Sequence, residues 1–172
     1  MKYQEAQILA VNSTIKCDVC NLYFAPHAVD THHAILTKGE VRGLPKIEKT
    51  KIDTPENLAV VHRQNHKGIA CHQIAHAFRI IPAASLIMRY GAVKVDEMLN
   101  SMTWKVSRPS LALSYEDASN ITQAFYYYLI DLDKAYRSTA SVVENFRLWV
   151  EPFTDIAPLL DAPWVSWGNA YV

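Results

Sequence analysis

The spacing of apolar residues predicts short strands in the first third of the chain and helices after it. Residues 21–24 and 28–36 are short β-prone runs, and residues 57–61 form a third, apolar run. Runs of this length, bounded by turn-forming residues, are typical of strands. Glycine and proline interrupt residues 37–56 repeatedly, so this segment is expected to be a loop.

From about His62 the apolar residues recur every three to four positions, which predicts a helix with one buried face. Pro82 is expected to end or kink this helix, and Gly91 to cap the one after it. Further helices are predicted at residues 83–90, 93–102, 114–136 and 141–150. The segment from Pro152 onward is too rich in proline for a long helix and too aromatic for a disordered tail. The pattern as a whole predicts an α+β protein.

Composition indicates a folded protein of one domain, or of a small domain and an extension. The chain has 172 residues, of which 50% are hydrophobic, and 17 basic residues balance 17 acidic ones. Disordered chains are poorer in apolar residues and carry more net charge. Zero net charge excludes a grossly basic DNA-coating protein, although it allows a local basic groove.

Neither a membrane span nor a signal peptide is expected. No apolar run approaches the roughly 20 residues that cross a bilayer, and the apolar run near the N-terminus is only four residues long, at 8–11. A Cys-x-x-Cys pair, Cys17 and Cys20, in a chain that is not exported favours metal or redox chemistry over a disulfide framework. We therefore expect a cytoplasmic protein.

Metal-ligating residue types are concentrated in one segment. All seven histidines lie between His27 and His76, and all three cysteines lie between Cys17 and Cys71. The chemistry is therefore expected there.

Two histidine pairs in this segment suggest a metal clamp. Adjacent residues on a strand point to opposite sides, so of His32 and His33 one can hold a metal while the other faces substrate or packs inward. His62 and His66 are four positions apart and would share one face of a helix. A clamp made of one strand histidine and one helix histidine leaves coordination positions open, as a catalytic metal requires. Imidazole suits zinc, nickel or manganese.

The ordered set Cys-x-x-Cys, His-His, a glycine-containing loop, Asn-Leu and His-x-x-x-His resembles the HNH endonuclease family, the ββα-metal nucleases. The resemblance covers about residues 15–76. It implies a small ββα-metal core at residues 1–80, followed by a mainly helical extension at residues 81–172. It also implies hydrolysis of DNA phosphodiester bonds, by nicking or by double-strand cleavage, with a divalent metal (Mg, Mn, Ni or Zn) as cofactor.

The resemblance also assigns roles to individual residues. His32 would bind the catalytic metal, and His66 would be the second ligand, from the helix. His33 would be the general base that takes a proton from water. Asn57 would brace the loop and orient His33 by hydrogen bonding.

A structural zinc ion is a further expectation, because Cys17, Cys20 and His62 could provide three of its ligands. Many family members supply a second Cys-x-x-Cys pair, whereas this chain has His62 and Asn65 there. Cys71 and His72 are both candidates for the fourth ligand. Alternatively, His62 belongs to the catalytic metal and the two cysteines are buried thiols.

Three further residues near the motifs have more than one interpretation. His72 and His76, again four apart, could be additional metal ligands, phosphate contacts or plain helix surface. Asp30 could orient an imidazole beside the metal or be an exposed turn residue.

Basic residues in the predicted loop and helix start form a plausible phosphate-contacting surface for DNA. They are Lys38, Arg42, Lys46, Lys49, Lys51, Arg63 and Lys67. The aromatic residues of the C-terminal half are expected to build the core or to contact a second copy or a protein partner. Two other functions compete with the nuclease: a catalytically inactive, zinc-stabilised module that binds nucleic acid or protein, and a Cys-x-x-Cys redox protein.

Overall fold

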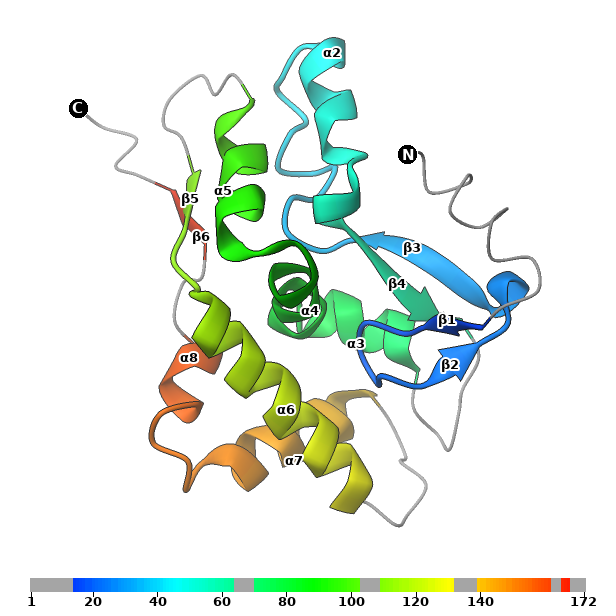
Figure 1. Ribbon diagram of the computed structural model, residues 1–172, viewed down its shortest axis with the longest axis vertical. Coiled ribbons are helices and arrows are strands. Elements are labelled where there is room, and N and C mark those ends of the chain that lie inside the picture. Colours follow the sequence, from blue (N-terminus) through cyan, green and yellow to red (C-terminus); the bar gives the residue numbers. More distant parts are fainter. Residues whose placement is uncertain (1–13, 64–69, 103–108, 132–138, 162–164, 168–172) are drawn as a thin grey trace.

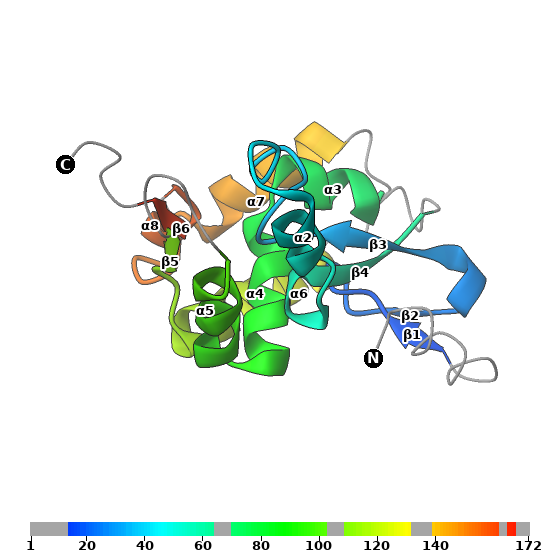
Figure 2. The ribbon, with the colours of Figure 1, turned by 90° about the horizontal axis from the view of Figure 1, so that it is seen from above.

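The computed structural model describes residues 14–63, 70–102, 109–131, 139–161 and 165–167 (Figures 1 and 2). Within these ranges the chain combines helices with three two-stranded antiparallel sheets, in agreement with the predicted α+β class. The strands are β1 (Ile15–Lys16), β2 (Tyr23–Phe24), β3 (Val29–His33), β4 (Leu58–His62), β5 (Pro109–Leu111) and β6 (Val165–Trp167). The helices are α2 (Lys46–Lys49), α3 (Cys71–Ala77), α4 (Ile80–Tyr90), α5 (Ala92–Asn100), α6 (Tyr115–Asp131), α7 (Thr139–Val150) and α8 (Ala157–Asp161), with 3-10 turns η1 (Pro26–Ala28), η2 (Thr50–Ile52) and η3 (Pro55–Asn57).

A tight turn joins β1 to β2 and carries Cys17 and Cys20. The Cys17 N–H donates to the carbonyl of Leu22 at 2.8 Å, and the Asn21 N–H donates to the carbonyl of Cys17 at 3.0 Å. Asn21 has a φ of 62°, a conformation that asparagine adopts more readily than most residues. The turn buries both cysteine side chains.

The ladder between β3 and β4 runs from the pair Val29–His62 to the pair His33–Leu58. His62 therefore ends a strand, and α3 begins only at Cys71. The prediction of a helix from about His62 was wrong, because the backbone of His62 continues the ladder opposite Val29. His62 consequently does not share a helix face with His66, and His66 itself lies outside the described residues.

The connection between β3 and β4 was expected to be a loop, but it contains α2 and the turns η2 and η3. Its two ends are joined by the fully buried side chain of Asn57. The Asn57 carboxamide oxygen accepts from the N–H groups of Ile35 and Leu36 at 3.0 and 2.7 Å. Its Nδ2 donates to the carbonyls of Leu36 and Ile52, each at 2.9 Å. The Asn57 carboxamide therefore bonds backbone N–H and C=O groups at both ends of the connection and holds them together.

Helix α4 lies at the centre of the molecule, beside α5 and α6 (Figure 1). Pro82 neither ends nor interrupts it, because Pro82 lies in the first turn, where backbone N–H groups have no partner within the helix. Gly91 has a φ of 88° and separates α4 from α5, in agreement with the predicted cap. A side chain there would be strained.

Described residues on both sides of position 80 contribute to one hydrophobic core, which extends from Cys17 to Leu160. Phe78 after α3 contacts Phe146 of α7, with ring centroids 6.1 Å apart. Phe146 in turn packs edge-on against Phe125 of α6 at 5.0 Å. Part of the C-terminal aromatic set is thus core. The division into a nuclease-like core at residues 1–80 and an extension at 81–172 stays a prediction.

Other aromatic and apolar side chains of the same helices are exposed. Tyr127 and Ile130 on α6 and Leu148 on α7 are each more than half accessible. A contact with a second copy or another protein through these residues stays a prediction. Among the described helices, none is both long and apolar enough to cross a bilayer.

We expect Asn57→Ala to lower the free energy of unfolding by about 3 kcal/mol, because it leaves several buried backbone groups of the β3–β4 connection without partners. Urea denaturation measures the change. The matched control is Asn100→Ala, which removes an exposed amide bonded to Asp96 and should cost less than about 1 kcal/mol. Equal losses for the two variants would contradict the bracing role of Asn57.

Candidate metal centres

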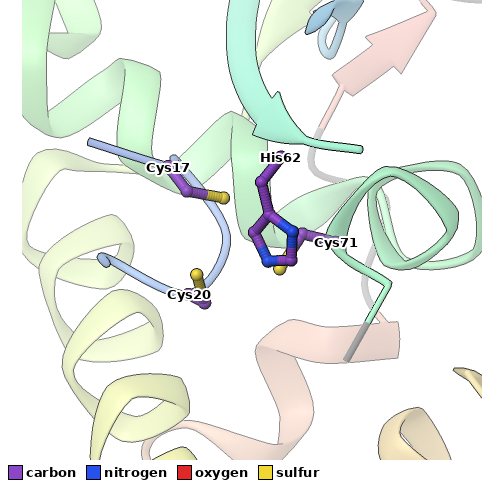
Figure 3. A group of neighbouring side chains, drawn as sticks. All are labelled: Cys17, Cys20, His62 and Cys71. Atoms are coloured by element: carbon purple, nitrogen blue, oxygen red, sulfur yellow. The ribbon is translucent and has the colours of Figure 1, made fainter. Parts of the chain in front are cut away.

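Four ligand side chains converge between the β1–β2 turn, the end of β4 and the start of α3 (Figure 3). They are Cys17, Cys20, His62 and Cys71, and all four are buried. Their ligand atoms lie within 4.8 Å of one another. Zinc–sulfur bonds of about 2.3 Å in a tetrahedron place the ligands about 4 Å apart. The group could therefore hold a metal ion such as zinc, and Cys71, one of the two candidates for the fourth ligand, joins the predicted three.

The chemistry of the three thiols also fits a cation. The thiols of Cys20 and Cys71 donate hydrogen bonds to the sulfur of Cys17 and lower the pKa of Cys17 to about 2. Burial raises the pKa of Cys71. Burial of three neighbouring thiols opposes their simultaneous ionisation when no cation is near. A divalent ion would stabilise all three as thiolates, because the thiolate is the form that binds metal.

Asp18, inside the Cys-x-x-Cys pair, holds this turn to the rest of the fold. Its carboxylate accepts from the Val60 N–H at 2.7 Å, and its own N–H donates to the Val60 carbonyl at 2.7 Å. Arg89 of α4 forms an ion pair with the same carboxylate, and the Ser85 hydroxyl donates to the Asp18 carbonyl at 2.9 Å. No local pattern predicts this role of Asp18, because its partners are more than 40 residues away along the chain.

A second group consists of three histidines: His32 from β3 with His72 and His76 from α3. One ring nitrogen from each lies within 4.8 Å of the others. His76 meets His32 edge-on, with ring centroids 4.5 Å apart, and stacks on His72 at 5.0 Å. The three burial levels differ: His32 is buried, His72 is half-buried and His76 is exposed. The group therefore opens to solvent on the His76 side.

The burial, the unpartnered Nε2 and the lowered pKa of His32 are all compatible with a role as metal ligand. Among the described residues its Nε2 has no hydrogen-bond partner, although the atom is buried. Burial, together with the neighbouring His76 and His72, lowers the pKa of His32 to about 4. The imidazole is therefore neutral near pH 7, which is the protonation state that coordinates metal. A bound ion would also satisfy the orphaned nitrogen.

Asp30 orients one of the helix histidines. Its carboxylate lies 3.2 Å from Nδ1 of His72 and forms an ion pair with Nε of Arg63 at 3.0 Å. This contact leaves Nε2 as the ring nitrogen of His72 that can bind a metal. Asp30 lies in β3 and not in an exposed turn, and its orientation of a metal-bound imidazole stays a prediction.

His33, next to His32 on β3, lies outside both groups of ligands. Its Nε2 is 2.7 Å from Oδ1 of Asp53, which lies 20 residues further along the chain. The side-chain hydrogen bonds of Asn57 reach backbone atoms, and its carbonyl accepts from the Ala34 N–H at 3.0 Å. Asn57 thus holds the backbone beside His33, and within the described residues its carboxamide bonds backbone groups and not the His33 ring.

The predicted phosphate-contacting residues have different surroundings. Lys51 donates to Glu48 and to the Ser101 carbonyl, at 2.9 and 2.8 Å, and Arg63 is bound to Asp30. Lys67, like His66, lies outside the described residues. The remaining members are exposed in the β3–β4 connection: Lys38, Arg42, Lys46 and Lys49. Their contact with DNA stays a prediction.

Comparison of the chain with protein-family models, with curated proteins and with solved structures gives no match in any of the three.

We expect the four-ligand group to take up one tightly bound zinc ion per chain, because its donor set and spacing suit tetrahedral zinc. Replacement of zinc by cobalt should produce a sulfur-to-cobalt absorption band in the wild type, and Cys71→Ala should weaken it strongly. The control is His72→Ala, which changes the next residue along the chain and should retain the band. A wild type without the band, or a Cys71→Ala variant with an unchanged one, would argue against the site.

Burial of His32 also predicts a pH dependence of stability. The pKa of His32 falls from its ordinary value of 6.5 to about 4 in the folded chain, so between these pH values the unfolded chain binds more protons than the folded one. The free energy of unfolding should therefore fall more steeply for the wild type than for His32→Gln as the pH drops from 6.5 towards 4. Urea denaturation of both proteins with one equivalent of zinc measures this. Parallel pH profiles would contradict it.

Proposed function

We propose that the protein is a metal-dependent endonuclease that hydrolyses DNA phosphodiester bonds. One divalent ion would bind at His32, His72 and His76, and His33 would act as the general base. The observation that carries the proposal is the three-histidine group, with a fourth histidine beside it on the same strand that belongs to neither ligand group. A binding module needs a zinc ion for its fold, but it does not need this second, solvent-open group.

The order of elements supports the proposal. Strand β3, a braced connection, strand β4 and helix α3 follow one another as the resemblance to the HNH family implies. The four-ligand group would be the structural zinc site. In this proposal His72 and His76 are the helix ligands, and His66, which the resemblance indicated, lies outside the described residues.

The chemistry follows from the positions of the side chains. His33 would accept a proton from a water molecule as the water oxygen forms a bond to phosphorus and the bond from phosphorus to the 3′ oxygen breaks. A divalent ion held by the three imidazoles would stabilise the negative charge on the phosphate and on the leaving oxygen. Three protein ligands leave coordination positions for these oxygens, and the exposed position of His76 gives access to them.

The exposed basic residues of the β3–β4 connection would contact DNA phosphates. The net charge of zero means that binding relies on this local surface and not on the bulk charge of the protein.

Plasmid cleavage with Mg²⁺, Mn²⁺ or Ni²⁺ tests the proposal. We expect His33→Ala to lower the rate about 100-fold or more, because it removes the general base. His76→Ala should lower both the rate and the affinity for the catalytic metal. The control is His27→Ala, which removes an exposed histidine outside both ligand groups and should cleave like the wild type.

Two outcomes would count against a nuclease. A wild type that binds metal but cleaves no DNA with any of these ions would instead be the zinc-stabilised binding module. Equal cleavage by the wild type and His33→Ala would mean that the activity does not depend on the proposed base.

A further inference from the structure

The contact between His33 and Asp53 determines which nitrogen of the imidazole carries the proton. Nε2 of His33 lies 2.7 Å from Oδ1 of Asp53. A carboxylate only accepts hydrogen bonds, so Nε2 must donate. A neutral imidazole has one N–H, and Nδ1 therefore has the free lone pair. Within the part of the chain that the structure describes, His33 makes no hydrogen bond through Nδ1.

We propose that Asp53 is a positioning residue that holds His33 in the Nε2–H tautomer and leaves Nδ1 to accept the proton of the attacking water. The catalytic part of this inference rests on the proposed nuclease function. The tautomer itself does not depend on that function.

The pair is held by the fold on both sides, unlike a chance ion pair between mobile surface side chains. Asn57 accepts from the N–H of Ala34, which follows His33, at 3.0 Å. The same residue donates to the carbonyl of Ile52, which precedes Asp53, at 2.9 Å. The side chain of Ile52 is buried. One residue thus sets the backbone positions of both partners.

The surroundings of Asp53 also favour a positioning role. Its side chain is 57% exposed, and within the described residues its carboxylate pairs only with His33. An exposed carboxylate close to a phosphate-binding site repels the substrate. If Asp53 did nothing for His33, its neutralisation would improve binding and leave the rate of the chemical step intact or higher. A positioning role predicts the opposite effect on that rate.

The first test is NMR of the imidazole nitrogens in the zinc-loaded, ¹⁵N-labelled chain at alkaline pH. His33→Gln identifies the signals by their loss. The wild type should show the shift pattern of the Nε2–H tautomer. Asp53→Ala should show a mixture of the two tautomers, because the acceptor that selects one of them is gone.

The second test is the steady-state rate of cleavage of a DNA oligonucleotide. Asp53→Ala should lower kcat about 10-fold or more and leave KM unchanged or lower. Asp53→Asn should not restore the rate, because its amide can donate to Nε2 and so favour the Nδ1–H tautomer. The matched control is Asp155→Asn, which neutralises an exposed aspartate before α8 and should leave both constants unchanged.

Each outcome decides one part of the inference. A wild-type ring protonated on Nδ1, or a tautomer that Asp53→Ala leaves unchanged, would overturn the positioning role. A changed tautomer with an unchanged kcat would overturn its catalytic part. A wild type that cleaves no DNA contradicts the nuclease proposal instead, and in that case the nitrogen shifts still decide whether Asp53 selects the tautomer.

Discussion

The structure depends on the convergence of Cys17, Cys20, His62 and Cys71, which join the β1–β2 turn, strand β4 and helix α3 at one point. Burial opposes ionisation of three thiols together, so a metal ion bound by this group would stabilise the arrangement. The convergence also fixes the start of α3. Because Cys71 belongs to the four-ligand group, the next residue, His72, is held in place on the first turn of the helix.

Besides helix α3, the ladder between β3 and β4 also connects the two candidate metal centres. His62, in the four-ligand group, pairs with Val29 at one end of the ladder, and His33 pairs with Leu58 at the other. His32, opposite Ala59, faces the histidines of α3. The two ligand groups therefore share one ladder and one helix. Displacement of α3 would separate His72 and His76 from His32, so an ion in the four-ligand group would also stabilise the geometry of the three-histidine group.

Structural features that depend on a few neighbouring residues could be predicted from the sequence. Residue types and spacing within a few positions predicted the strand before His62 and the cap at Gly91. The start of α3 was wrong by about nine residues, because backbone pairing with β3 extended the strand through His62. Spacing could not choose between Cys71 and His72 as the zinc ligand, since adjacent helix residues differ mainly in direction. The contact of His33 with Asp53 spans 20 residues and has no local signal.

Two aspartates near the proposed site bind different ring nitrogens of two histidines. Asp30 takes Nδ1 of His72, so Nε2 of that ring is left for a metal. Asp53 takes Nε2 of His33, so Nδ1 of that ring is left for a proton. Both carboxylates are engaged with imidazoles, which reduces their repulsion of a phosphate. In the proposed nuclease, a chain without net charge would thus place acidic groups beside the phosphate, each of them acting through a histidine.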